Sequence, residues 1–215
     1  MKPKLLGAIM LLVAVISFSA MSTRGQDQPA AQKPKPPMPA SLQQAGPSAP
    51  ASVRSPAEKY FSDVELINQD GQKMRFYSDV LKNKVVIINT FFVTCTSVCP
   101  PLNRNMEKVQ DALGDRLGKD AFLVSISVDP EADTPPRLKE YSRKFHARPG
   151  WIFLTGNKEN VDWALYKLGQ YVENKDSHST IIIIGNEPKG LWKKAFGLAK
   201  ADELITIVED VINDR

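Results

Sequence analysis

The fold is decided by the stretch Thr90-Phe91-Phe92-Val93-Thr94-Cys95-Thr96-Ser97-Val98-Cys99-Pro100-Pro101, which holds both cysteines of the chain. An apolar run over residues 84–92 leads into this stretch, and a helical pattern begins at its two prolines. The cysteines therefore lie at a predicted strand-to-helix turn, where side chains are exposed and the first backbone N–H groups of the helix are free. A dithiol at such a turn indicates a metal-binding or redox site.

Outward from this stretch, apolar runs of strand type alternate with amphipathic helical patterns. The predicted strands cover residues 61–67, 73–77, 85–92, 121–128, 151–154, 179–184 and 191–196, and the predicted helices cover 101–117, 137–146, 157–168 and 201–212. Asp70-Gly71 is a hairpin signal between the first two strands. The alternation predicts the α/β class: a central, mainly parallel sheet with helices on both faces and an N-terminal β-hairpin addition. A cysteine pair directly after a central strand is typical of a thioredoxin-like fold.

The two thiols can act on one target because Cys95 and Cys99 are four residues apart and share one face of a helical turn. Cys99 also abuts the helix N-terminus, which favours the thiolate and predicts a pKa below the usual value of about 8.5. Two thiolates are soft donors, which select Cu(I), or zinc where four donors gather. Zinc is disfavoured because no second Cys/His pair exists, and c-type haem is excluded because CxxCH is absent.

A site with two sulfurs needs a further donor, and the chain offers two histidines. His146 lies near the end of a predicted helix, where a surface histidine interacts favourably with the helix C-terminus. His178 lies just before a central strand, and in a thioredoxin-type sheet that turn lies beside the cysteine loop. Its imidazole would complete a Cys₂His set that can hold Cu(I) as a three-coordinate ion, or Cu(II) with a further ligand.

Several residues at or near the predicted site allow both a functional and a purely structural interpretation. The cysteines could form a disulfide staple in an exported domain, although a four-residue separation closes too short a loop to stabilise much. The acidic residues Asp129, Glu131 and Asp133 could contact a partner or tune copper, and a solvated loop with a helix cap explains them equally well. The large aromatic residues are expected to serve packing, with a pair of phenylalanines forming a dry wall beside the site: Phe91, Phe92, Trp151, Trp163 and Trp192.

Three parts make up the predicted domain organisation. Residues 1–23 have the basic start and apolar run of a signal peptide or N-terminal membrane anchor. Residues 24–57 contain half of the chain's 16 prolines and are expected to be a Pro-rich flexible tether. Residues 58–215 are expected to be a thioredoxin-like copper-binding domain. The net charge of +4 comes from the N-terminal segment, so it gives no case for nucleic-acid binding.

Three motifs together resemble the Sco/SenC family over about residues 59–213: the run from Val85 through Cys95 to Cys99-Pro100, the loop Ser127-Val128-Asp129-Pro130 with Asp133-Thr134-Pro135, and His178-Ser179 before a strand. The most specific part is CxxxCP combined with a distant histidine. Three details depart from the usual family pattern. Thr96 and Ser97 follow the first cysteine in place of proline, no acidic residue lies between the cysteines, and Ser177 separates Asp176 from His178. These departures leave the ligand positions intact.

The resemblance implies a thioredoxin-fold copper protein that helps assemble the binuclear copper centre of cytochrome c oxidase. By motif, the thiolate ligands map onto Cys95 and Cys99 and the imidazole ligand onto His178, for one copper, Cu(I) or Cu(II), per chain. The expected partners are the copper-accepting oxidase subunit, other copper chaperones and thiol reductants. The expected location is the bacterial periplasm, with the N-terminal segment anchoring the chain to the inner membrane.

Two alternatives remain beside the copper chaperone. The first is a periplasmic thiol-disulfide oxidoreductase without obligatory metal, in which Cys95 and Cys99 form the redox-active catalytic pair. The second is a redox or copper sensor. Reductases with this fold usually have CxxC spacing and a cis-proline facing the dithiol. Here the spacing is CxxxC and no proline stands beside His178, and both features favour metal binding.

Overall fold

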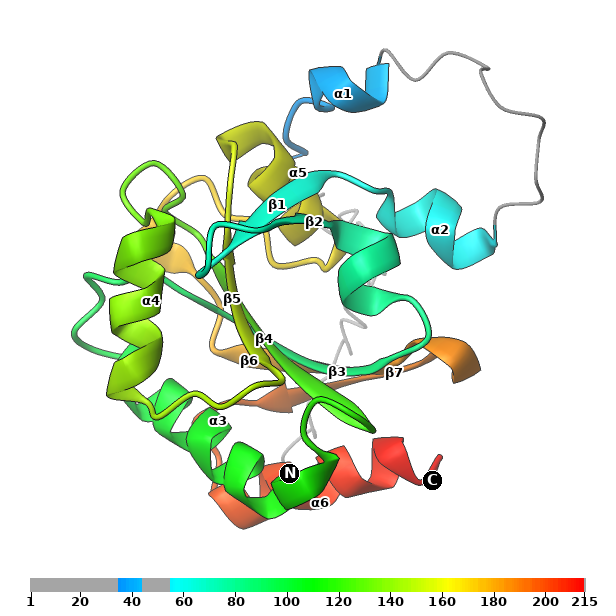
Figure 1. Ribbon diagram of the computed structural model, residues 1–215, viewed down its shortest axis with the longest axis vertical. Coiled ribbons are helices and arrows are strands. Elements are labelled where there is room, and N and C mark those ends of the chain that lie inside the picture. The colour runs from blue at the N-terminus through cyan, green and yellow to red at the C-terminus, as the bar shows by residue number, and fades with distance from the viewer. Residues whose placement is uncertain (1–34, 44–54, 215) are drawn as a thin grey trace, which may run out of the picture. The chain divides into compact units, whose positions relative to one another are not determined.

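The computed structural model describes residues 35–43 and 55–214, and within them a seven-stranded sheet in the order β2-β1-β5-β4-β3-β6-β7 (Figure 1). The strands are β1 (Glu65–Asn68), β2 (Lys73–Arg75), β3 (Val85–Phe91), β4 (Ala121–Ser127), β5 (Trp151–Thr155), β6 (Ile181–Asn186) and β7 (Leu191–Phe196). Strands β3 and β4 lie at the centre and are almost wholly buried, which explains why their sequences are continuous apolar runs.

The sheet is mixed. Strands β3, β4 and β5 run parallel, whereas β1 pairs antiparallel with β2 and β5, and β6 pairs antiparallel with β3 and β7. The expectation of a mainly parallel sheet therefore holds for the three central strands, and the predicted hairpin β1–β2 is antiparallel as expected. The expectation fails where β1 joins β5 and where β6 joins β3, because β6 enters the sheet at the end where β3 leaves it and so runs antiparallel to β3.

Helices cover both faces of the sheet (Figure 1). They are α1 (Ala40–Gln43), α2 (Pro56–Phe61), α3 (Cys99–Leu113), α4 (Pro135–Lys144), α5 (Lys158–Lys167) and α6 (Ala201–Ile212), with a π-helical turn η1 (Phe76–Leu81) and short 3₁₀ turns. One apolar cluster joins the sheet to α3, α4 and α6 and includes both cysteines. The second cluster joins the opposite face to α2, η1 and α5. The thioredoxin-like, layered α/β prediction is confirmed.

The start of the domain differs from the prediction. The strand expected over 61–67 begins only at Glu65, because Pro56–Phe61 form α2. Ser55 caps this helix by accepting the Glu58 N–H at 3.1 Å, and Pro56 occupies the first helical position. This is a local helix-start signature, which the weak apolar alternation nearby obscured.

The predicted signal peptide or anchor, residues 1–23, lies outside the described residues. Within the predicted tether, residues 35–43 are described, and Ala40–Gln43 form the single turn α1. None of the helices in the described ranges has the length and hydropathy to cross a bilayer.

Candidate metal centre

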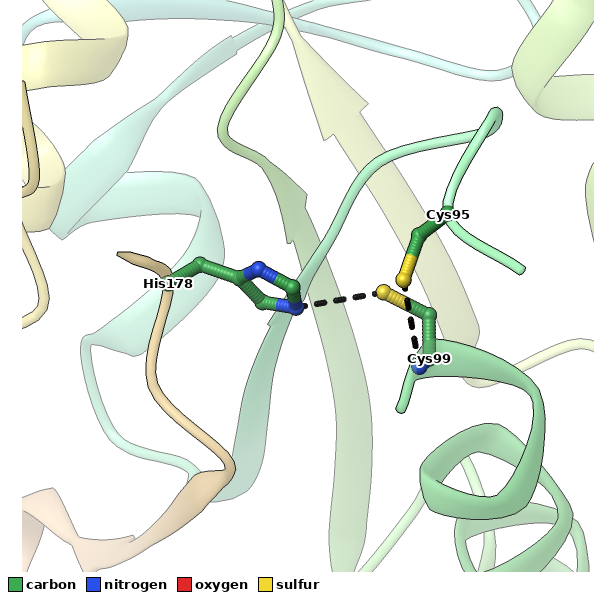
Figure 2. A group of neighbouring side chains, drawn as sticks. All are labelled: Cys95, Cys99 and His178. Atoms are coloured by element: carbon green, nitrogen blue, oxygen red, sulfur yellow. Dashed lines mark hydrogen bonds between the residues drawn. The ribbon is translucent and has the colours of Figure 1, made fainter. Parts of the chain in front are cut away.

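The cysteine loop follows the carboxyl end of β3 and closes onto the start of α3. Its turn is fixed by the Cys95 N–H, which donates to the Phe92 carbonyl at 3.1 Å. Cys99 is the first residue of α3, and prolines occupy the next helical positions. The Cys99 N–H donates to the Cys95 sulfur at 3.4 Å, so that sulfur accepts from an otherwise free N–H group of the helix (Figure 2).

His178 approaches the same point from a different part of the chain. It follows the 3₁₀ turn Lys175–Ser177 and precedes β6. Its Nε2 lies 3.2 Å from the Cys99 sulfur, and one donor atom from each of Cys95, Cys99 and His178 lies within 4.8 Å of the others (Figure 2). Cys99 and His178 lie 79 positions apart in the sequence. The fold thus brings together the three residues that were predicted as a ligand set.

The imidazole is held in one tautomer by its own loop. His178 Nδ1–H donates to the Lys175 carbonyl at 2.8 Å, because a carbonyl oxygen can only accept. The lone pair of Nε2 therefore faces the sulfurs, which is the arrangement found for histidines that ligate metals. The ring also packs edge-on against Phe92, with 5.2 Å between ring centroids.

The two thiols are not equivalent. Cys95 is 8% exposed and Cys99 is fully buried. Burial tends to raise the pKa of Cys95, but hydrogen bonds from Cys99 and Ser97 outweigh it and the pKa is lowered. Burial, together with the neighbouring Cys95, raises the pKa of Cys99. The prediction of a low pKa for Cys99 was therefore wrong, because its sulfur is buried and the free N–H at the helix start donates to the sulfur of Cys95 instead.

The acidic loop after β4 has one buried member. Asp133 is fully buried, and its Oδ2 accepts from the Val93 N–H at 3.0 Å and from the Ser127 hydroxyl at 2.7 Å. Burial raises the pKa of Asp133 despite these hydrogen bonds. The reading of this loop as wholly solvated is thus wrong for Asp133, which holds the cysteine loop at its first residue, whereas Glu131 is exposed.

Asp129 supports the histidine from the same loop. Its carboxylate pairs with Lys175 at 2.6 Å, and the carbonyl of that lysine accepts from His178. The Lys175 ammonium also lies 5.3 Å from the centre of the Phe92 ring. Through Lys175, the loop after β4, the turn before His178 and the residue that precedes the cysteine loop are therefore in contact.

A buried polar network supports α3 beneath the dithiol. Asn103, one turn after Cys99, accepts from Asn89 of β3 at 2.9 Å and donates to the Tyr141 hydroxyl at 2.9 Å. Asn89 in turn accepts from Ser125, which accepts from the Trp151 indole. This network was not predicted from the sequence. Its available signal was two asparagines, Asn89 and Asn103, placed on otherwise apolar faces.

The other predicted residues fall around the centre or away from it. His146 is exposed and bonds Glu107 at 2.6 Å, and it is absent from the Cys95–Cys99–His178 group found in the described part of the chain. Phe91 stacks on Tyr141 with 4.9 Å between ring centroids, so Phe91 and Phe92 both form an apolar wall, as predicted. Trp151 and Trp163 are buried and Trp192 is half-buried, which fits the packing roles expected for them.

The fold and these residues define a class: a thioredoxin-like protein whose dithiol faces an imidazole across the ends of two neighbouring strands. Comparison with known proteins then narrows the class. The SCO1/SenC family model matches residues 53–213, and the chain belongs to this family.

Individual relatives agree with this assignment. The chain is 38% identical over 103 residues to a SCO2-like protein of Rickettsia conorii, spanning 48% of this chain and 48% of that relative, and 31% identical over 133 residues to the SCO1 protein homolog of Bacillus subtilis, spanning 60% and 67%. The chain thus spans about half the length of the Rickettsia relatives that it matches.

Solved structures are similar over the domain. A SCO1/SenC family lipoprotein from Bacillus anthracis matches with a TM-score of 0.58 and 28% identity, covering 68% of this chain and 91% of that one. The structure of Arabidopsis thaliana ScoI with copper bound matches with a TM-score of 0.60 and 26% identity, covering 73% and 99%.

Proposed function

We propose that this protein binds one copper ion per chain through Cys95, Cys99 and His178. The observation that carries the proposal is the convergence of two sulfurs and the Nε2 lone pair, all within 4.8 Å of one another. Two thiolates and one neutral imidazole suit copper, because soft sulfur donors select Cu(I) and imidazole supports either oxidation state. The Arabidopsis relative, whose structure was determined with copper bound, supports the choice of metal.

The proposal also includes the delivery of the bound copper to another protein. The family resemblance implies delivery to the binuclear copper centre of cytochrome c oxidase, from a domain anchored to the inner membrane and exposed to the periplasm. Incoming thiols of the acceptor would displace the protein ligands one at a time. Cys95 is the more exposed sulfur, so exchange would begin there.

A copper titration tests the binding step. Reduced protein is titrated with Cu(I) against a chelator, and Cu(II) binding is followed through sulfur-to-copper charge-transfer absorbance. The native chain should bind one copper tightly, and Cys95→Ser and His178→Ala should lose that affinity. His146→Ala is the matched control, since it removes the exposed histidine and leaves the three donors in place. Equal affinity in the native chain and His178→Ala would contradict the ligand set.

One observation favours a second activity, the reduction of disulfides. The Cys99 N–H donates to the Cys95 sulfur and so stabilises a Cys95 thiolate. That thiolate would attack a target disulfide to form a mixed disulfide and release one target thiolate. Cys99 would then lose its proton to solvent, attack Cys95 and release the second target thiolate, so two electrons pass from the dithiol to the target. Metal-free protein reducing a test disulfide, with His178→Ala nearly as active and no copper bound, would favour this activity over the chaperone.

A further inference from the structure

Residues 35–43 fold against the domain although they belong to a proline-rich stretch. Pro36 and Pro39 are buried, whereas Lys35, Pro37 and Met38 are exposed. Two buried prolines three positions apart match the period of a polyproline II helix, in which every third residue lies on the same face. The burial pattern is therefore that of a docked extended segment with one face against the protein.

The local sequence determines this extended shape. Each proline fixes its own φ near −65°, and each residue that precedes a proline is biased away from the helical region. In Lys35-Pro36-Pro37-Met38-Pro39, three residues precede a proline. The extension stops at Pro39, whose carbonyl accepts the N–H groups of Leu42 and Gln43 at 3.0 and 3.2 Å and so begins α1. Little conformational entropy is lost on docking, because the segment is extended beforehand.

The surface that receives this segment is formed mainly by α2 and α5, and it carries aromatic rings and charges of both signs. The Lys35 ammonium lies 5.7 Å from the centre of the Trp163 ring. From α5, the Lys167 ammonium lies 5.0 Å from the same ring and 4.8 Å from that of Tyr60 in α2. Leu42 packs against the apolar cluster on this face of the sheet. The segment thus touches the domain at both of its ends.

We propose that the α2–α5 surface is a docking site for a proline-rich segment and that its occupant is residues 35–43 of the same chain. The docked segment, here called the latch, holds Lys35 and Leu42 on the sheet face covered by α2 and α5, whereas the dithiol belongs to the apolar cluster on the opposite face. The latch therefore keeps this part of the proline-rich stretch on the face of the sheet away from the dithiol.

The latch can be tested in the full chain by labelling the tryptophan side chains with ¹⁵N and recording their three indole signals. The double variant Pro36→Ser/Pro39→Ser should shift the Trp163 signal and leave that of Trp151, which is buried on the other face. Pro37→Ser is the matched control, because Pro37 lies between the two buried prolines and is itself exposed. Trp163→Phe assigns the signal.

Hydrogen exchange of the same proteins gives a second readout. In the native chain and Pro37→Ser, the amides of Leu42 and Gln43 should exchange at least about tenfold more slowly than in an unfolded peptide, and the double variant should lose this protection. Unchanged protection of α5 in all variants would show that the domain stays folded. Random-coil exchange at Leu42 in the native chain, or an equal Trp163 signal in the double variant, would overturn the latch. A Trp163 signal that varies with protein concentration would show that residues 35–43 dock onto another copy of the chain, and it would overturn docking within one chain.

Discussion

Asp133 is the residue on which the cysteine loop depends most, because one of its oxygens accepts from both Val93 and Ser127 inside the protein. Asp133→Ala leaves the buried Ser127 hydroxyl and the partly buried Val93 N–H without an acceptor, and we expect it to lower the free energy of unfolding by about 1–3 kcal/mol. Urea unfolding measures this loss. Glu131→Ala, an exposed change in the same loop, should have no measurable effect, and equal losses in the two variants would contradict the anchoring role.

The same carboxyl predicts a pH dependence with a definite sign. Burial raises the pKa of Asp133 in the folded state, with nearby Asp129 raising it further and Arg137 opposing. The folded state then binds this proton more tightly than the unfolded state does, so stability falls as pH rises from the unfolded value of 3.8 through the folded pKa. The difference in unfolding free energy between the native chain and Asp133→Asn should change with pH in this direction. A flat difference would contradict the raised pKa.

Asp129 affects the metal centre indirectly, because it pairs with Lys175 and the carbonyl of Lys175 orients His178. In Asp129→Asn the ion pair with Lys175 is lost, and the carbonyl that orients His178 is held less firmly. We expect a several-fold loss of Cu(I) affinity, less than the 10- to 100-fold typical of residues that touch a metal-bound histidine directly. Chelator competition measures the affinity. Asp176→Asn, beside the histidine and exposed, is the control and should bind copper as the native chain does.

At the scale of elements, the starts of β4 and β5 depend on a close contact between two backbone segments. A Cβ added to Gly150 would lie 2.5 Å from the Gly118 nitrogen, and its φ is +101°. Gly150→Ala should therefore destabilise the protein by more than the roughly 1–2 kcal/mol that a left-handed conformation alone costs a non-glycine residue. Thermal unfolding measures this effect. Gly114→Ala is matched, since Gly114 also has a positive φ of +54° but open space around it, and it should show the strain alone.

The elements that sequence predicted well are those in which one signal dominates. Strand β3 and helix α3 followed from a continuous apolar run and from a helical period that starts at prolines. Helix α2 was missed because its cap, Ser55 with Glu58, is a two-residue signal beside a loose apolar alternation. The direction of β6 is implied by the predicted place of His178, because a residue just before β6 can lie beside the loop after β3 only if the two strands run antiparallel, as they do.

The metal centre was predictable only in part, because only some of its contacts leave a local signal in the sequence. The pairing of Cys95 with Cys99 is local, and the place of His178 follows from the sheet order of the fold. The support beneath them is not local: Asp133 accepts from the Val93 N–H and from the Ser127 hydroxyl, and Asn103 donates to the Tyr141 hydroxyl. No periodicity or spacing in the sequence predicts such contacts. The raised pKa of Cys99 arises mainly from burial, which the sequence does not show either.

At the scale of the whole molecule, copper would join α3 to the loop before β6. Ligands that bind the folded state raise its stability, and a copper ion at 100 times its dissociation constant contributes about 2.7 kcal/mol. For a domain of this size we expect a rise in unfolding temperature of about 5–10 °C. Calorimetry with and without Cu(I) measures it. His178→Ala should show a much smaller rise and His146→Ala the full one; a full rise in both would place copper elsewhere.

The pairing of β3 with β6 has a consequence for how the chain can change in length. Ile88 faces Ile183 in this pair, and the Thr90 hydroxyl donates to the Ser179 carbonyl at 3.2 Å, next to the histidine. One residue inserted within β6 would turn every side chain before it to the other face, and His178 with them. Insertions between residues 168 and 174 would leave the register untouched. Gaps between related chains should therefore accumulate in that loop and be absent from the two strands, although neither strand contributes a ligand.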